Sequence, residues 1–376
     1  MNKPVAHIFV FLEIFAQEGG IQSYIKDVLR AYCANGLPGR TEVFLLRDEP
    51  GCDNPFEDFL SFHYLKTLPP WKGRLKLALS VLGCLIKHRP ERVFCGHINL
   101  APLIRLLCQP LGIPYTVLTY GKEVWQPLPT PQRQALQAAS HIWTISRYSR
   151  DRLTQANEID PQKVEILPCV VDEKKFFPAE KPPELINKYG LAGALVLMTV
   201  ARLWSGDIYK GVDVTIRALP KILSTFPQVK YLVIGRGDDR PRLEQLAQAL
   251  GVADRVVFAG FVPTEDLVNH YRVADAYIMP SQEGFGIVYL EALACGIPVL
   301  SGDSDGSADP LQDGRLGWRV PHRDPDAVAE AVLEILRGGT GRCDAQWLRQ
   351  ETLEQFSQET LKKKLKQLLI TNANFS

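Results

Sequence analysis

Residues 283–291 read Glu-Gly-Phe-Gly-Ile-Val-Tyr-Leu-Glu, and this stretch carries most of the information about the fold and the site. Glu283 stands in a short Gly-rich segment, whereas Glu291 stands in an apolar run that continues to Ala294. A helix that starts near Gly286 would carry Glu291 on its second turn and leave Glu283 in the preceding loop. The start of a helix presents backbone N–H groups without partners and the positive end of the helix dipole. The stretch therefore predicts an anion site with one carboxylate on each side.

A phosphate with hydroxyl-rich groups at both ends would suit this arrangement, and a nucleotide-sugar is such a molecule. The alternative is a loop and a helix whose two glutamates simply face water, which is the usual situation of a glutamate. The flanking sequence favours the first interpretation, as the loops described below indicate.

The bulk composition is that of a globular protein. A length of 376 residues favours two domains over one. With 46% hydrophobic and 23% charged residues, the composition is ordinary for a globular protein. The net charge of +1 excludes a polyelectrolyte binder. Residues 60–152 are uneven, however, with 13 Lys and Arg against three acidic residues. That region suits an anionic partner such as acidic lipid, a phosphorylated acceptor or nucleic acid.

The eight cysteines form no C-x-x-C pair and no cluster with His at ligand spacing. We interpret them as reduced thiols in a cytoplasmic protein and expect no metal site. The N-terminus leads directly into a strand-like run without the pattern of a signal peptide. No apolar stretch reaches the roughly 20 residues of a membrane span.

Short β-rich runs alternate with segments of helical periodicity, which predicts parallel sheets built from βαβ units. A Pro-rich break at 177–183 separates two such blocks. We expect an α/β protein with two Rossmann-like domains facing a central cleft, residues 1–178 and 179–354, with a final helix over about 355–376 packing back onto the first. The predicted strands are Val5–Leu12, Glu42–Leu46, Arg92–Cys95, Tyr115–Thr119, His141–Ile145, Lys163–Ile166, Ala194–Val200, Val229–Ile234, Arg255–Phe258, Ala276–Met279 and Ile297–Ser301.

The loops after the first strand of each block contain ligand-binding residue types, and ligands bind at such strand ends in open α/β sheets. Gly19 and Gly20 would allow close approach of the backbone, although a plain tight turn is as good an interpretation. Arg202 and Lys210 lie in one βα connection and would suit a diphosphate. Taken singly, each is more often a solvated surface charge.

Two further loops in the second block are less specific. Gly235-Arg236-Gly237 is an incomplete dinucleotide fingerprint and weak support for NAD. The turn at 260–263 exposes backbone groups that would suit the edge of a base.

In this order the loops resemble family 4 of the retaining glycosyltransferases, which have the GT-B fold. The resemblance covers nearly the whole chain and is most specific in its C-terminal half. It runs through Gly19-Gly20, Arg202, Tyr209-Lys210-Gly211, Gly235-Arg236-Gly237, Gly260-Phe261-Val262, Ala274-Asp275, Pro280-Ser281, Glu283 to Glu291 and Ala294-Cys295-Gly296-Ile297-Pro298-Val299.

The resemblance implies a role for each residue of the site. Arg202 and Lys210 would neutralise the donor diphosphate and stabilise the charge that develops on it as it leaves. Glu283 would contact the donor sugar, so these three residues are the catalytic candidates, and no metal or other cofactor is implied. The remaining donor-binding candidates are Gly19 and Gly20 near the phosphates, Gly235, the main chain of Phe261 and Val262 at the base, the cradle of Phe285, Gly286, Ile287 and Val288, and Glu291 at the ribose.

The sequence departs from the family pattern in two places. Tyr120 occupies a position where a His often stands, and a phenol with a pKa of about 10 does not titrate like imidazole. His97 is the other candidate for that role. The acceptor-side candidates are His97, Asn99, Tyr120, Lys122 and Glu123. The D-x-D formed by Asp303 and Asp305 is interpreted as a chance match to a metal signature.

We therefore predict a retaining, metal-independent hexosyltransferase that moves a sugar from a UDP- or GDP-linked donor to a sugar or lipid-linked acceptor. Polysaccharide or cell-envelope glycolipid synthesis is the expected setting, and nucleic acid is not expected as a partner. One alternative is a GT-B-fold nucleotide-sugar epimerase, which would require further carboxylates and a His near the sugar. The other is a non-catalytic nucleotide-sugar-binding protein.

The segment 71–89 combines basic residues at both ends with an apolar middle, as an interfacial helix does. We expect the N-terminal domain to meet an anionic or lipid-linked acceptor at a membrane, with the protein cytoplasmic and peripheral on the inner face. The alternative is an ordinary core helix that carries its lysines on the wet side.

Overall fold

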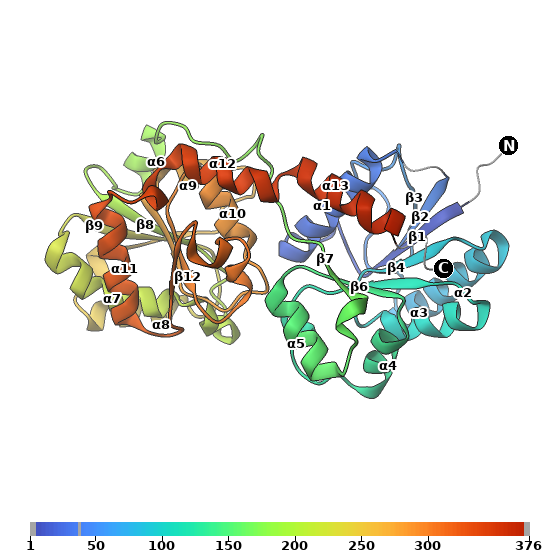
Figure 1. Ribbon diagram of the computed structural model, residues 1–376. Coiled ribbons are helices and arrows are strands. Elements are labelled where there is room, and N and C mark those ends of the chain that lie inside the picture. Colours follow the sequence, from blue (N-terminus) through green and yellow to red (C-terminus); the bar gives the residue numbers. More distant parts are fainter. Residues whose placement is uncertain (1–4, 37–38, 372–376) are drawn as a thin grey trace. The chain divides into compact units, whose positions relative to one another are not determined.

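The computed structural model describes residues 5–36 and 39–371. The chain divides into two compact units, one formed by the residues up to Val170 together with those from Gln358 onward, the other by Val171–Ser357. Each unit is a parallel sheet flanked by helices (Figure 1). The sequence placed the boundary at residue 178, within the Pro-rich segment, and the start of the returning helix near 355.

The sheet of the first unit has seven parallel strands in the order β3-β2-β1-β4-β5-β6-β7. The central strands are buried along nearly their whole length, as expected where helices cover both faces of a sheet. The strands are β1 Val5–Phe11, β2 Arg40–Leu45, β3 Ser61–Tyr64, β4 Arg92–Cys95, β5 Tyr115–Leu118, β6 His141–Thr144 and β7 Val164–Ile166. The helices are α1 Gly20–Ala34, α2 Pro70–His88, α3 Ala101–Cys108, α4 Thr130–Ala138, α5 Arg147–Asn157 and α13 Gln358–Thr371.

Helix α13 packs beside α1, at the opposite end of the sequence (Figure 1). The side-chain amide of Asn35 donates to the carbonyl oxygen of Lys362 at 3.1 Å, and Gln358 Nε2 donates to Asp27 Oδ1 at 2.9 Å. Leu361 and Leu365 are buried on the same helix. The last helix is therefore an integral part of the first unit.

The second unit repeats the architecture with six parallel strands in the order β10-β9-β8-β11-β12-β13. The order of the strands reverses between β8 and β11, which makes their carboxyl ends the topological switch point. The strands are β8 Leu195–Val200, β9 Val229–Ile234, β10 Val256–Gly260, β11 Ala276–Met279, β12 Val299–Gly302 and β13 Trp318–Val320. The helices are α6 Pro183–Lys188, α7 Val212–Thr225, α8 Arg240–Ala249, α9 Leu267–Val273, α10 Ile287–Ala294, α11 Pro325–Arg337 and α12 Ala345–Phe356.

The predicted strands are confirmed within a few residues at their ends, and two short strands were missed. Both β3 and β13 lie at the edge of their sheets and have only four and three residues, respectively. All four residues of β3 are partly exposed, so it lacks the buried apolar run that marks the central strands. Within the described residues, no helix combines the length and apolar character needed to cross a membrane.

Candidate functional site

The carboxyl ends of β8 and β11 carry the residues at the centre of the predicted donor site. The chain leaves β8 through Arg202 and a 3₁₀ segment, Ser205–Lys210, before α7 begins. It leaves β11 through a loop that contains Glu283 and then enters α10 at Ile287. The helix thus begins where the sequence predicted, with Glu283 in the loop and Glu291 on the second turn.

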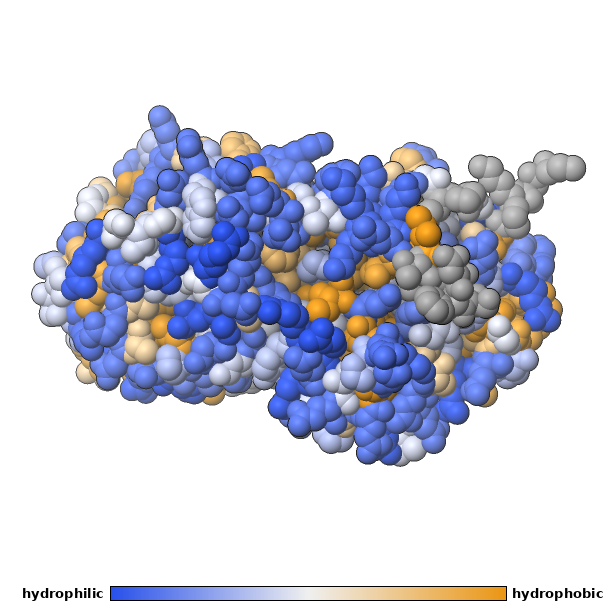
Figure 2. Space-filling view, in the orientation of Figure 1, coloured by the Kyte–Doolittle hydropathy of each residue, from blue (hydrophilic) through white to orange (hydrophobic). Residues whose placement is uncertain are grey.

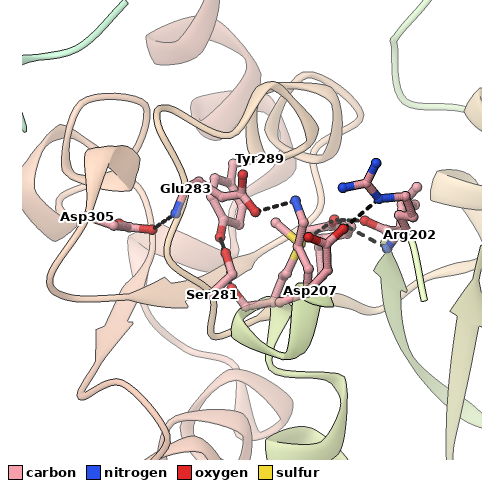
Figure 3. A network of polar contacts seen from close by, with 10 residues as sticks. Arg202, Asp207, Ser281, Glu283, Tyr289 and Asp305 are labelled. Carbon is pink, nitrogen blue, oxygen red and sulfur yellow. Dashed lines mark hydrogen bonds and ion pairs between the residues drawn. The ribbon is translucent and has the colours of Figure 1, made fainter. Parts of the chain in front are cut away.

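Each cation of the first loop is paired with a carboxylate (Figure 3). Lys210 Nζ lies 2.5 Å from Glu283 Oε1, and both side chains are largely buried. Arg202 Nε donates to the buried Asp207 at 2.6 Å, and this hydrogen bond raises the pKa of the guanidinium. The Arg202 guanidinium is mostly exposed and lies over the Trp204 ring at 5.3 Å. Two positive charges are therefore oriented within a single βα connection.

Asp305 fastens the loop that carries Glu283. Its Oδ2 accepts the backbone N–H of Glu283 at 2.6 Å, and its Oδ1 accepts that of Ser307 at 2.9 Å. In return the N–H of Gly306 donates to the carbonyl oxygen of Glu283 at 2.9 Å. Burial raises the pKa of Asp305 to about 6. The second aspartate of the D-x-D is thus part of the site's framework, and Figure 3 shows it on the opposite side of Glu283 from Arg202.

A buried tyrosine, Tyr289, stabilises the same loop through hydrogen bonds. Tyr289 OH donates to the carbonyl oxygen of Met279 at 2.9 Å and lies 2.9 Å from Ser281 Oγ. Gly286 caps α10 with φ of 90°, and an added Cβ there would lie 2.3 Å from the Tyr289 ring. Only glycine meets both requirements, because other residues rarely adopt this conformation. The start of α10 is consequently held in one position.

Glu291 is oriented by Tyr271, a residue that the sequence analysis did not identify. Tyr271 OH donates to Glu291 Oε2 at 2.7 Å, and the tyrosine is completely buried. Burial raises the pKa of Tyr271, so the phenol stays protonated and keeps its role as donor. The two residues are 20 positions apart, and no local spacing signals the contact.

The rest of the predicted phosphate cradle is backbone rather than side chain. Phe285 is buried and packs edge-on against Phe356 at 5.7 Å, so only its main chain is available. Ile287 and Val288 form the first turn of α10 and are partly buried. The first N–H groups of a helix have no intrahelical partners and point toward its start. The start of α10 thus presents backbone N–H groups of the kind that bind anions, and binding of a phosphate there stays a prediction.

Gly235 and the 261–262 turn lie beside the Arg202 loop. A Cβ on Gly235 would lie 1.8 Å from the carbonyl oxygen of Ala201, so this glycine permits the close approach of two strand ends. The exposed Phe261 ring stacks under the Arg236 guanidinium at 4.6 Å, whereas Val262 is buried. These residues border the β8 end on the side toward β9 and β10.

The predicted residues of the first unit lie at three of its strand–helix connections. Gly19 and Gly20 form the start of α1, and a Cβ on Gly20 would meet no atom within 4 Å. Packing within the described residues therefore does not require a glycine at position 20. The acceptor-side candidates follow β4 and β5, and all five come after the carboxyl end of one of these strands: His97, Asn99, Tyr120, Lys122 and Glu123.

Two of these candidates stabilise the local fold. Tyr120 is buried, and its hydroxyl donates to the carbonyl oxygen of Gly96 at 2.7 Å. Glu123 accepts the backbone N–H groups of Tyr120 and Gly121, and burial raises its pKa. Both side chains thus tie the end of β5 to its surroundings.

The other candidates of this group are more accessible. Asn99 and Lys122 are exposed. His97 is partly buried and accepts the N–H of Asn99 at its Nδ1, 3.0 Å away, and burial lowers its pKa. Asn99 and Lys122 are thus accessible to solvent, whereas Tyr120 is not.

No group of three or more His, Cys, Asp or Glu side chains suited to a metal ion occurs within residues 5–36 and 39–371. Asp303 is exposed and accepts a hydrogen bond from Ser304, whereas Asp305 is engaged with the Glu283 loop. The two aspartates therefore make different contacts.

Comparisons with known proteins show the family of the chain. Residues 194–338 match the family model described as Glycosyl transferases group 1, and residues 19–169 match Glycosyl transferase 4-like domain. The chain is 35% identical over 265 residues to the GDP-mannose-dependent alpha-(1-6)-phosphatidylinositol monomannoside mannosyltransferase of Mycolicibacterium smegmatis, covering 66% of this chain and 68% of that protein.

Two further proteins extend the similarity over most of the chain. The GDP-mannose-dependent monoacylated alpha-(1-6)-phosphatidylinositol monomannoside mannosyltransferase of Corynebacterium glutamicum is 28% identical over 88% of this chain and 91% of its own. The crystal structure of HepE from Anabaena in complex with UDP superposes with a TM-score of 0.80 at 18% identity, covering 98% of this chain and 100% of that one.

Two units, each with a parallel sheet of this topology, define the GT-B fold. The chain belongs to the group 1 glycosyltransferases, which are family 4 of this enzyme class.

Proposed function

We propose that the protein is a retaining, metal-independent hexosyltransferase that moves a sugar from a nucleoside-diphospho-sugar to a lipid-linked acceptor of the cell envelope. The observation that carries the donor half is the arrangement of Arg202, Lys210 and the start of α10 around the ends of β8 and β11. Two cations and a helix start suit a diphosphate, and the carboxylates of Glu283 and Glu291 suit the hydroxyl groups on either side of it.

Catalysis follows from what changes when the sugar leaves. Breakage of the bond between C1 and the phosphate oxygen places negative charge on the nucleoside diphosphate. Arg202, Lys210 and the α10 dipole stabilise that charge more strongly in the transition state than in the ground state. The ammonium of Lys210 has three N–H donors, so it can keep Glu283 in place while it contacts phosphate. Retention of configuration rests on the family resemblance, with the acceptor attacking from the face that the diphosphate leaves.

The relatives indicate the kinds of substrate. Both curated proteins described above are named as GDP-mannose-dependent and as acting on phosphatidylinositol mannosides. We propose a GDP- or UDP-linked hexose, with GDP-mannose the first to test, and an inositol phospholipid or its glycoside as the acceptor. The basic region over residues 60–152, which lies in the first unit, is consistent with an anionic lipid.

Helix α2 supports an encounter with the membrane. One face, with Gly73, Leu77, Val81 and Leu85, packs into the unit. The other face exposes a large apolar stripe that includes Trp71 at 61%, Leu79 at 61% and Ile86 at 58% exposure. Figure 2 shows hydrophobic residues among hydrophilic ones over the region of α2.

Basic side chains accompany this stripe. Lys72, Arg74 and Lys76 are exposed on the same helix, and Lys72 Nζ lies 5.8 Å from the centre of the Trp71 ring. A basic helix with an outward apolar stripe is typical of an interfacial anchor. We propose that α2 places the protein on an anionic membrane, on its cytoplasmic face.

The deciding experiment offers GDP-mannose, UDP-glucose and UDP-galactose with and without phosphatidylinositol, and measures both nucleoside diphosphate release and glycolipid formation. Acceptor-dependent release with an α-linked product supports the proposal, and the anomeric coupling in the proton NMR spectrum of the product tests retention. Sugar epimerisation without an acceptor would identify an epimerase. Binding of donor without release of diphosphate would identify a non-catalytic protein.

A further inference from the structure

The first unit contains a cavity of about 1050 Å³ that the donor-site argument does not use. Pockets for small molecules commonly occupy 300–1,000 Å³, so this one is large enough for a sugar-bearing headgroup. Its wall includes residues directly after β1, β2 and β3 and the segment after β4. The order of the strands reverses between β1 and β4, so the cavity lies at the switch point of this sheet. Ligands of open α/β sheets bind at such points.

The charged lining of the cavity is predominantly positive. Arg47, Lys66 and Arg74 contribute cations, and Glu13 is the one acidic residue among those that form the wall. Arg47 lies 3.7 Å from Glu13, and Lys66 lies 2.8 Å from the exposed Glu49. The Lys66–Glu49 pair is exposed on both sides and such pairs are weak, so Lys66 can exchange Glu49 for a ligand.

Arg74 is the strongest candidate among the three cations for a phosphate. Its side chain makes no ion pair or hydrogen bond with any residue that the structure describes. A guanidinium binds two phosphate oxygens at once. Arg74 follows Gly73 on α2. A Cβ on Gly73 would lie 3.2 Å from the carbonyl oxygen of Leu65. The glycine therefore permits the first turn of α2 to lie close to the end of β3.

The rest of the wall divides into polar and apolar parts. Thr67, Asn99 and Gln132 offer hydrogen bonds, and Gln132 Oε1 is buried without a partner in the described part of the chain. An unpaired buried acceptor suits a ligand hydroxyl group. Leu68 and Leu75 also line the cavity, yet they are 80% and 52% exposed, so the cavity opens onto the apolar side of α2.

We infer that this cavity binds the headgroup of an anionic amphiphile, in which a phosphodiester links a polyol or sugar to a hydrocarbon tail. The phosphate would contact Arg74 and Lys66, the hydroxyl groups would face Asn99 and Gln132, and the tail would pass over Leu75 onto the outer side of α2. This inference rests on the proposed function only for the identity of the reaction. It adds the residues that would contact the acceptor.

The same headgroup chemistry occurs in a lipid and in its water-soluble deacylated form. Equilibrium binding measured by calorimetry separates them, with dihexanoyl phosphatidylinositol kept below its micelle concentration, glycerophosphoinositol, and free inositol as probes. We expect the lipid to bind more tightly than glycerophosphoinositol and free inositol to bind least. Equal affinity for inositol and glycerophosphoinositol would overturn the phosphate contact.

Substitutions in the cavity wall test which residues contact the phosphate and the hydrocarbon tail. Arg74→Gln and Lys66→Gln should each weaken binding of both phosphate-bearing probes about tenfold, the scale of one charge-assisted hydrogen bond. Leu75→Gln should weaken binding of the lipid but not of glycerophosphoinositol. The matched control is Lys364→Gln, which removes one exposed charge from α13 and should leave both affinities unchanged. Wild-type affinity in Arg74→Gln and Lys66→Gln would overturn the assignment of this cavity.

Because the readout is binding, the test is independent of catalysis. If the protein binds the lipid in the cavity but transfers no sugar, the proposed reaction fails and the cavity assignment stands. If it transfers sugar to the lipid with an unchanged KM in these variants, the reaction stands and the acceptor binds elsewhere.

Discussion

Lys210 Nζ lies 2.5 Å from Glu283 Oε1 and joins the loop after β8 to the loop after β11. The pair connects the residue proposed to hold the leaving diphosphate with the residue proposed to contact the sugar. One contact thereby holds the two loops together, and if they bind the donor as proposed, such preorganisation would reduce reorganisation during the reaction.

Replacement of the cations should affect the chemical step. We expect Lys210→Ala and Arg202→Ala each to lower kcat by about two to three decades, the scale for one preorganised stabiliser of developing charge. Initial rates of diphosphate release with saturating donor measure this. Lys221→Ala is the matched control, because Lys221 lies on α7 in an exposed pairing with Asp326 and Glu330. A near-normal kcat in either site variant would remove that residue from the phosphate site.

Tyr271→Phe should weaken donor binding more than it slows transfer. The change removes the hydroxyl group that donates to Glu291 Oε2 and leaves the ring in place. Loss of one hydrogen bond to a charged group is worth about 1.5–3 kcal/mol, so the KM for the donor should rise at least about tenfold. Tyr231→Phe serves as the control, since this buried tyrosine bonds to Thr199 within the sheet. Equal effects of the two variants on KM would mean that Tyr271 has only a structural role.

Asp305 should make stability depend on pH. Its pKa is about 6 in the folded protein against 3.8 for an ordinary aspartate, so between these values the folded state binds more protons than the unfolded state. Stability must then fall as pH rises through this range. The wild type should therefore lose stability relative to Asp305→Asn between pH 4 and 7, by an amount on the order of 2 kcal/mol.

Thermal unfolding of both proteins across this pH range measures the difference. Asp303→Asn is the control, because Asp303 is exposed and lies two positions away in the sequence. A difference between wild type and Asp305→Asn that does not change with pH would show that Asp305 has the same pKa folded and unfolded.

Transfer should continue in excess EDTA. Stabilisation of the leaving group is assigned to Arg202, Lys210 and the α10 start, which are present in the protein itself. We expect the rate to change by less than about twofold after chelation. Complete loss of activity that Mn²⁺ or Mg²⁺ restores would instead indicate a metal site and direct attention to Asp303.

The protein should bind acidic vesicles in a salt-sensitive manner. Each basic residue near an anionic leaflet contributes about 1 kcal/mol, so the Lys72/Arg74/Lys76→Ala variant should lose most of its binding. Flotation with and without phosphatidylglycerol measures this at two salt concentrations. A Lys363/Lys364/Lys366→Ala variant removes the same charge from α13 and should still float. Equal binding to neutral vesicles would leave a soluble acceptor as the better interpretation.

The central strands were predictable because most of their residues are apolar and lie in short β-rich runs. Val229–Ile234, buried on both faces, matches its predicted bounds. The edge strand Ser61–Tyr64 has no such run, since solvent reaches one side of it. One face of α2 packs into the core and the other remains exposed with its basic residues. This arrangement is compatible with either interpretation of the segment, and binding to a membrane stays a prediction.

The site was predictable only where its chemistry is local. Glu283, Gly286 and Glu291 form a pattern within one loop and one helix, and the helix starts where that pattern indicated. The contacts of Tyr271 and Asp305 join residues that are 20 and 22 positions apart, through a fold that brings them together. Sequence spacing contains no signal for such contacts. The D-x-D was interpreted as a chance match, and nothing in the sequence indicated that Asp305 accepts hydrogen bonds from the Glu283 loop.

The return of α13 to α1 has a consequence for biosynthesis. The ribosome completes the whole of Val171–Ser357 before it makes the helix that covers α1. Domains usually fold in the order in which they are made, but here the unit that begins first lacks a part of its own core until translation reaches Gln358. The second unit is therefore the first that can reach its native state on the ribosome, and a chain arrested before Gln358 would expose the apolar side of α1 to chaperones.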